Sequence, residues 1–404
     1  MSGGQRVRRF LSGMLALAVV VGVAYGAAAL LSPLPALVVE QTFDGVADSS
    51  WSSELPLPDV GSTALVAESG SLVSSGSAEP RPIAGAAKLV LANVVLDAEP
   101  LTTGATGAAI TIDQAAVNRY RELDAAGART VAVEFGQTWT RRDLLAATLI
   151  GSGNNTAELL IDAVFGGPDA YLLAASTWLN EQGLVDSTVT DGTGLDPGSR
   201  STAVELARVA HLTLDNAVLA GLLNDRPRDT SAGADFADGA LFLSEQQTLG
   251  LSRSYTDAAG VCVLFAVPVG DEVIIVSMLG QLGYPAAEAA GIALIEAVRV
   301  AVREVEIVAP AEVVAVARSA WGQSTDIVAV DGITVSSTEL DDLDVRVDPA
   351  ARSTIVRGTD AGSLMVTAGG IEQVVRLEST SAITEPGVAW RFADPVTVIQ
   401  RWTG

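Results

Sequence analysis

Lys88 is the side chain in this sequence that is best suited to proton transfer. It is the only lysine among 24 basic residues, and it stands in the segment "RPIAGAAKLV", residues 81–90. A buried lysine can lose its proton near neutral pH and act as a base, which an arginine cannot do. A helical pattern follows Pro82, so Gly85 and Lys88 are expected on one helix face, one turn apart. A serine at position 85 would form an activated Ser-Lys pair there, but glycine offers no hydroxyl group.

Ser152 and Asn154 form a second polar group, in the segment "SGN" between two helical patterns. A hydroxyl and a carboxamide two residues apart can relay a proton and hold a substrate amide. The same three residues also fit an ordinary helix cap, and both interpretations remain open.

Composition excludes several other chemistries. Cys262 is the only cysteine and His211 the only histidine, so neither a disulfide nor a Cys/His metal site can form within the chain. Cys262 lies in the apolar stretch "AGVCVLFAV" and is expected to be a buried thiol. The net charge of −24 opposes a nucleic-acid partner, because phosphates would be repelled. We therefore expect no metal, no cofactor and no nucleic acid.

The elements that must position these residues follow a mixed α/β pattern. Residues 62–77 predict two strands joined by a tight turn at Glu68–Ser71. Helical patterns follow over residues 84–96, from Thr111 as the N-cap with Gln114 at the capping-box position, and in further segments up to the helix that carries His211. Beyond residue 241 the pattern predicts strands that turn at Gly270–Asp271, and then one more helix.

The two ends of the chain differ from this central part. Phe10–Leu31 is apolar and long enough to cross a bilayer, and Arg6, Arg8 and Arg9 before it place the N-terminus in the cytoplasm. The alternative is a cleaved signal peptide, for which the small residues 24–29 offer a cutting site. Residues 32–52 read as a stalk. Beyond Glu304 short Val-rich segments alternate with turns, which predicts an all-β module of sandwich or barrel type without helices.

The order of these motifs resembles one enzyme family. Ser-x-x-Lys, then Ser-x-Asn, then Lys-Thr-Gly on a strand is the signature of penicillin-binding proteins and serine β-lactamases. The flanking segments are similar to the actinobacterial D-alanyl-D-alanine carboxypeptidases, which are low-molecular-weight penicillin-binding proteins. Those segments are "PIAGAAKLVLANVVLDAEPL", "LLAATLIGSGNNTAELL", "GLVDSTVTDGTGLDPGSRST" and "YTDAAGVCVLFAV". The resemblance covers residues 62–302 and implies an α+β fold, with an antiparallel sheet, a helical cluster and a C-terminal all-β domain.

The chain departs from the family pattern at two of the three motifs. By this resemblance Lys88, Ser152 and Asn154 match the catalytic positions, whereas the nucleophilic serine falls on Gly85. The Lys-Thr-Gly triplet, which holds the substrate carboxylate, falls on Ser252-Arg253-Ser254. Arg253 is one residue out of place for the missing cation, because neighbouring side chains on a strand point to opposite faces. A β-bulge would be needed to re-aim it.

These departures lead to a functional hypothesis with an alternative. The chain is interpreted as a catalytically inactive relative that binds a peptidoglycan stem peptide or a cell-wall protein partner, with the membrane reached through its N-terminal helix. The alternative is an active carboxypeptidase that uses a rearranged Ser152-Lys88 pair; a partner-binding module that relies on the β domain is a third possibility. The predicted domains are a cytoplasmic N-terminus (1–9), an anchor or signal (10–31), a stalk (32–52), the carboxypeptidase-like domain (53–303) and the β domain (304–404).

Overall fold

The computed structural model describes residues 3–43, 45, 51–393 and 395–403. The chain forms two compact units. We call Ser50–Arg303 the central unit, and Met1–Ser49 together with Glu304–Gly404 the outer unit. Each unit is described by itself.

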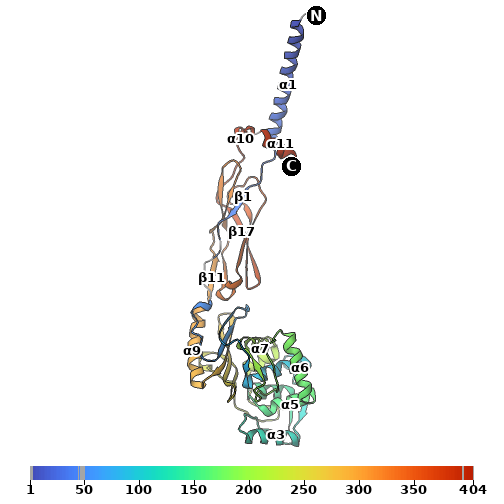
Figure 1. Cartoon of the computed structure of the whole chain (residues 1–404), viewed down its shortest axis with the longest axis vertical. Coiled ribbons are helices and arrows are strands. Elements are labelled where there is room, and N and C mark those ends of the chain that lie inside the picture. Colours follow the sequence, from blue (N-terminus) through green and yellow to red (C-terminus); the bar gives the residue numbers. More distant parts are fainter. Residues whose placement is uncertain (1–2, 44, 46–50, 394, 404) are drawn as a thin grey trace. The chain divides into compact units, whose positions relative to one another are not determined.

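A five-stranded antiparallel sheet in the order β3-β2-β10-β9-β8 forms the centre of the central unit (Figure 1). Its strands are β2 (Ser62–Val66), β3 (Leu72–Gly76), β8 (Leu249–Thr256), β9 (Gly260–Val269) and β10 (Glu272–Gln281). Nearly all of β9 is buried, because α9 (Tyr284–Ala301) packs on one face of the sheet and α7 (Ala203–Asp215) on the other. Each face therefore has its own hydrophobic core.

The helix that carries Lys88 is the central helix of this unit. It is α2 (Ala87–Ala98), which is buried from Ala87 to Leu96 and contacts α4, α5, α6 and α7. The other helices surround it: α3 (Gln114–Ala125), α4 (Arg141–Leu149), α5 (Asn154–Phe165), α6 (Pro168–Glu181) and α8 (Ala217–Asp225). Two short pairs complete the cluster: β4 (Arg81–Pro82) with β7 (Arg200–Ser201), and β5 (Ala109–Thr111) with β6 (Thr138–Thr140). The α+β fold expected from the sequence is confirmed.

Local chemistry decides where these elements begin and end. The predicted hairpin over residues 62–77 is confirmed, with its turn closed by a hydrogen bond from Gly70 N to Ala67 O. The predicted start of α3 at Thr111 is wrong. Thr111 ends strand β5, and the N-cap is Asp113, whose carboxylate accepts a hydrogen bond from Ala116 N at 2.8 Å.

Cys262 and His211 occupy structural positions. Cys262 lies in β9 with none of its surface exposed, and burial raises the pKa of its thiol to about 11, so it is not a reactive thiolate at neutral pH. His211 lies on α7 with Nε2 3.5 Å from the carboxylate of Asp215, one turn further along the helix. Both residues lack the surroundings of a catalytic group.

The outer unit is built on a six-stranded sheet in the order β1-β12-β13-β17-β16-β15. Its strands are β1 (Val38–Gln41), β12 (Val313–Arg318), β13 (Ser324–Ala329), β15 (Asp344–Pro349), β16 (Asp360–Ala368) and β17 (Ile371–Ser379), and a separate pair joins β11 (Glu304–Val308) to β14 (Ile333–Ser336). The segment predicted as a stalk thus contributes β1, an edge strand that pairs with β12; residues 44 and 46–50 of that segment lie outside the described residues.

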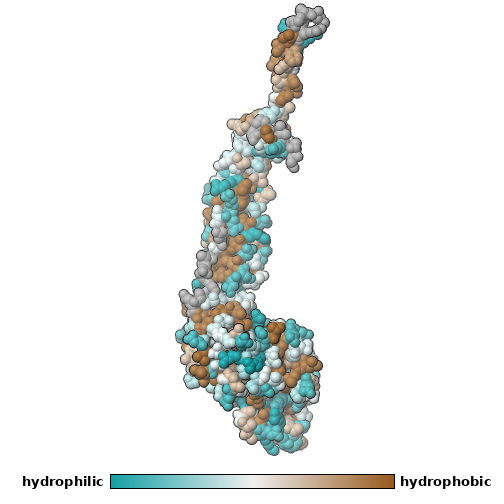
Figure 2. Space-filling model, viewed as in Figure 1, coloured by the Kyte–Doolittle hydropathy of each residue, from teal (hydrophilic) through white to brown (hydrophobic). Residues whose placement is uncertain are grey.

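Helices at both ends of the chain belong to the outer unit. Within α1 (Gly3–Leu31), the segment Val7–Leu31 is long and apolar enough to cross a membrane, and Figure 2 shows its hydrophobic side chains on the visible surface. The expectation of no helix beyond Glu304 is wrong. Helices α10 (Val388–Phe392) and α11 (Pro395–Thr403) lie there, each shorter than the window over which a helical period is usually recognised.

Gln41 links the two edge strands of the six-stranded sheet. Its Nε2 donates to Val345 O at 3.1 Å and to Phe43 O at 2.7 Å, while its Oε1 accepts from Val347 N at 3.1 Å. The side-chain amide therefore takes the place of a backbone peptide group and links β1 to β15 by hydrogen bonds.

Gln41→Ala is expected to destabilise the outer unit by about 0.5–1.5 kcal/mol, because three exposed hydrogen bonds within the sheet are replaced by bonds to water. Gln41→Glu should destabilise it further, since a carboxylate would face two carbonyl oxygens. Thermal unfolding of the two variants beside the parent chain measures the difference. Equal stability of all three proteins would show that the hydrogen bonds of the Gln41 side chain contribute nothing to the stability of the outer unit.

Candidate active site

Lys88 lies in the first turn of α2, and only 4% of it is exposed. Its Nζ donates a hydrogen bond to Thr193 O at 3.1 Å. Burial lowers the pKa of the amine to about 7; the Asp191 carboxylate opposes this shift and the Arg129 guanidinium adds to it. Near neutral pH both protonation states are therefore populated, as a general base requires.

Gly85 lies in the 3₁₀ turn Ala84–Ala86, which precedes α2, so the α-helix begins at Ala87 and not at residue 84 as expected. A Cβ atom built on Gly85 would lie 3.3 Å from Lys88 Nζ, 3.1 Å from Ser254 Cβ and 3.6 Å from Ser254 Oγ. The backbone of Gly85 is not left-handed, so its conformation does not require glycine. A hydroxyl group at this position would be near the Lys88 amine, but the side chain of Ser254 would crowd it.

Strand β8 brings the third motif beside this turn. Ser252 and Ser254 are buried, and Ser254 Oγ donates to Cys262 O at 3.5 Å. The guanidinium of Arg253 lies 4.1 Å above the ring of Tyr284, the first residue of α9, and so on the α9 side of the sheet. The register of β8 does shift between Gly250 and Ser252, but this irregularity leaves the guanidinium stacked on Tyr284.

Ser152 and Asn154 lie at the break between α4 and α5. Ser152 has a φ of +53°, which is rare for a residue with a side chain. Asn154 is 4% exposed, and its Nδ2 donates to Arg129 O at 3.0 Å, while its Oδ1 is buried without a partner among the described residues. Among the contacts of the described residues, the Lys88 amine donates to Thr193 O and to neither of these two side chains.

The motif residues surround one small cavity. Its volume of about 10 Å³ is at the lower limit for a single water molecule. The candidate residues that line it are Gly85, Lys88, Ser152, Ser252 and Arg253. Asn154 and Ser254 do not line it, although Ser254 lies beside Gly85. The structure therefore gathers five of the seven candidate residues, but around a space too small for a peptide.

Two residues that shape this site, Arg129 and Asp191, were not among the candidates predicted from the sequence. Arg129 Nη1 donates to Gly239 O at 2.8 Å and to Arg253 O at 3.2 Å, which places a cation beside β8, from a loop that no motif marks. Asp191 orders the loop that bonds Lys88, because its carboxylate accepts from Gly194 N at 2.9 Å and Ser199 Oγ at 2.8 Å. The signals for that loop in the sequence were its turn-rich composition and its place in one of the segments that resemble the carboxypeptidase family.

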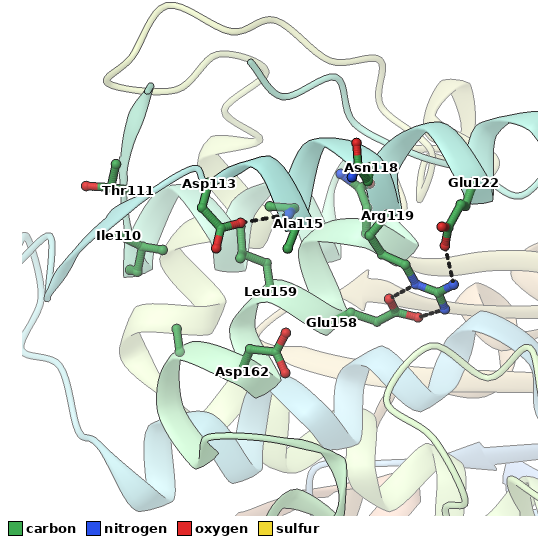
Figure 3. Close-up of a pocket in the computed structure, with 13 residues that line it drawn as sticks. Ile110, Thr111, Asp113, Ala115, Asn118, Arg119, Glu122, Glu158, Leu159 and Asp162 are labelled. Carbon is green, nitrogen blue, oxygen red and sulfur yellow. Dashed lines mark hydrogen bonds and ion pairs between the residues drawn. The ribbon is translucent and has the colours of Figure 1, made fainter. Parts of the chain in front are cut away.

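A larger groove of about 670 Å³ lies between α3 and α5, separate from the motif residues (Figure 3). Arg119 in its wall is paired with Glu158 and with Glu122. Burial raises the pKa of the Asp162 carboxyl, and Glu158 and Asp113 add to the shift. This groove carries none of the catalytic motifs.

Comparisons with solved structures agree on the fold. Penicillin binding protein 6B from Escherichia coli matches with a TM-score of 0.60 at 16% identity, over 83% of this chain and 99% of that one. Penicillin binding protein 5 from Haemophilus influenzae matches with a TM-score of 0.56 at 16% identity, over 82% and 99%. The Streptomyces K15 DD-transpeptidase matches with a TM-score of 0.52 at 20% identity, over 60% and 97%. At these identities the likeness concerns the fold alone.

Sequence comparisons identify the family. A search of curated protein sequences found no match. The sequence profile of the D-alanyl-D-alanine carboxypeptidase family, peptidase S11, matches residues 61–281, which is more than half of the chain. The same residues contain the sheet, the helical cluster and the motif cavity described above. The chain therefore belongs to the D-alanyl-D-alanine carboxypeptidase family of low-molecular-weight penicillin-binding proteins.

Proposed function

We propose that this chain is a catalytically inactive member of its family, with a binding or scaffolding role at the cell wall. The observation that carries the proposal is at position 85, where a hydroxyl group would lie near Lys88 Nζ and the chain has none. The side chain of Ser254 and the small size of the cavity support it further. Ser252-Arg253-Ser254 replaces the substrate-binding Lys-Thr-Gly of the family, with Arg253 stacked on Tyr284.

The proposed setting is the outside of a cell membrane. Residues 10–31 serve as a single-pass anchor, residues 1–9 lie in the cytoplasm, and the remaining chain is extracytoplasmic. A peptidoglycan stem peptide or a cell-wall protein is the partner, bound by the central unit or through the β domain at residues 304–404. No cofactor, metal or nucleic acid takes part.

One alternative rests on a specific observation. Ser152 and Lys88 line the same cavity, and a Ser-Lys pair can act as nucleophile and base. Ser152 lies between α4 and α5, whereas the family's nucleophile position, Gly85, lies in the turn before α2. Displacement of a nucleophile by even about 1 Å lowers the reaction rate substantially. The geometry therefore favours the inactive form.

Fluorescent penicillin is expected to leave the purified chain unlabelled, because no hydroxyl at position 85 can form the acyl bond. A denaturing gel read by fluorescence measures this, with release of D-alanine from a muropeptide as the second assay. A covalent label that mass spectrometry maps to Ser152 would establish the alternative. Release of D-alanine would refute the inactive form.

A further inference from the structure

The C-terminal end of α1 is contacted by α10 and α11, which belong to the same unit (Figure 1). Tyr25 Oη donates to Phe392 O at 3.1 Å, and the two rings meet edge to face with centroids 5.7 Å apart. Trp402 Nε1 donates to Ala28 O at 3.1 Å. Helices α10 and α11 thus each contact a defined site on α1, more than 350 residues away in the sequence.

Arg391 closes the end of α1. Its Nη1 donates to Leu30 O at 3.1 Å and to Ser32 O at 3.2 Å. The last carbonyl groups of a helix have no partner within the helix, and they carry the negative end of its dipole. A guanidinium is therefore a favourable cap, and at the edge of a bilayer, where water is scarce, the bonds gain strength.

These contacts fall on the segment where a signal peptidase would have to cut. Small residues at positions 24–29 provide the sequence for cleavage. In the structure α1 continues to Leu31, and Ala29 is completely buried. A cut after Ala29 would remove Tyr25 and Ala28, and with them the partners of Phe392 and Trp402.

We propose that residues 25–32 are the docking site for the chain's own C-terminal helices in the mature protein, which requires that the N-terminal helix be retained. Three observations support it independently: the aromatic contact at Tyr25, the arginine cap at Leu30 and Ser32, and the burial of Ala29. The exposed aromatic side chain of Trp402 then lies at the outer end of the span, where tryptophan is enriched in membrane proteins. The outer unit is thereby held at the membrane by both ends of the chain.

The first test measures the intact mass of the full chain after expression in a bacterial inner membrane. The expected mass includes residues 1–404, with or without the initiating methionine. A mature chain that lacks residues 1–29 would overturn the proposal. That outcome would also remove the proposed single-pass anchor at residues 10–31, but it would leave the proposed loss of activity untouched, because position 85 is unaffected.

The second test probes the docking directly with the photo-crosslinker p-benzoylphenylalanine in place of Phe392. The ring of Phe392 lies beside Gly26, 4.0 Å from where a Cβ atom on that glycine would be, so the crosslinker starts next to α1. Mass spectrometry is expected to find residue 392 joined to the peptide that contains Tyr25.

The same crosslinker at Ile371 is the matched control. Ile371 is exposed and begins β17, and Ser379 at the other end of this strand is about 27 Å away. From that other end the chain continues toward α10 through Thr384, whose N donates a hydrogen bond to Gln323 Oε1 at 2.9 Å. Capture of α1 from both positions, or from neither, would refute the docking site.

Discussion

Fluorescent penicillin is expected to label the chain only when both motifs that depart from the family signature are rebuilt together. Gly85→Ser combined with Ser252→Lys, Arg253→Thr and Ser254→Gly should give a labelled band, and Gly85→Ser alone should not. Penicillin should acylate the rebuilt variant several powers of ten faster than it acylates the parent chain. This is the usual effect of a nucleophile and the groups that bind its substrate. Band intensity against time measures the rate.

The geometry around position 85 explains why one change is not enough. The amine of Lys88 already lies 3.3 Å from where the new Cβ would be, close enough to serve as the base that the proposal requires. Ser254 Cβ, however, would be only 3.1 Å from that atom, and overpacking of this kind costs about 1–3 kcal/mol and displaces side chains. Ser254→Gly removes the obstruction, and Ser252→Lys supplies the cation that Arg253 does not provide while it stacks on Tyr284.

Lys88→Met added to the rebuilt variant is the control, and it should abolish labelling, because the new serine would then lack its base. Labelling of Gly85→Ser alone would show that Ser254 and the third motif are no barrier. A rebuilt variant that folds but stays unlabelled would mean that acylation fails for a reason outside these four positions.

The sequence predicted the fold and the motif residues because both depend on local patterns. The hairpin over residues 62–77, the helices around α2 and the strands before α9 all follow from apolar spacing and turn residues. The α+β fold followed from their order together with the resemblance to a known family. Lys88 was singled out as the residue that could act as a base if buried, and it is 4% exposed.

Long-range contacts are what the sequence could not predict. The position of Arg129 beside β8 depends on the path of a loop, and the contact between Gly85 and Ser254 depends on how a turn and a strand meet across more than 160 residues. Strand β1 lies in a segment whose composition favoured a stalk, and it is a strand because β12 offers it an edge. Helices α10 and α11 likewise contact α1, so their place depends on tertiary structure more than on propensity.

Lys88→Met is expected to stabilise the protein near neutral pH. The pKa of the amine is about 7 in the folded chain, against 10.5 for a lysine side chain exposed to water. Its burial as a cation therefore opposes folding by an amount on the order of 4–5 kcal/mol. Methionine removes this penalty but leaves Thr193 O without its donor, which costs about 1–3 kcal/mol. The net gain should be about 2 kcal/mol at pH 7.

The pH dependence of the unfolding free energy distinguishes removal of the buried Lys88 charge from an improvement in packing. Between pH 7 and the ordinary lysine pKa of 10.5 the unfolded chain keeps the Lys88 proton and the folded chain loses it, so the stability of the parent rises with pH. The expected rise is about 2 kcal/mol from pH 7 to pH 9, and Lys88→Met should lack it. Above pH 9 the raised pKa of Cys262 acts in the opposite direction, because the unfolded thiol ionises first, so the comparison ends there. Urea unfolding of both proteins in detergent, followed by tryptophan fluorescence, measures the two slopes; parallel slopes would mean that the Lys88 amine keeps its proton in the folded protein.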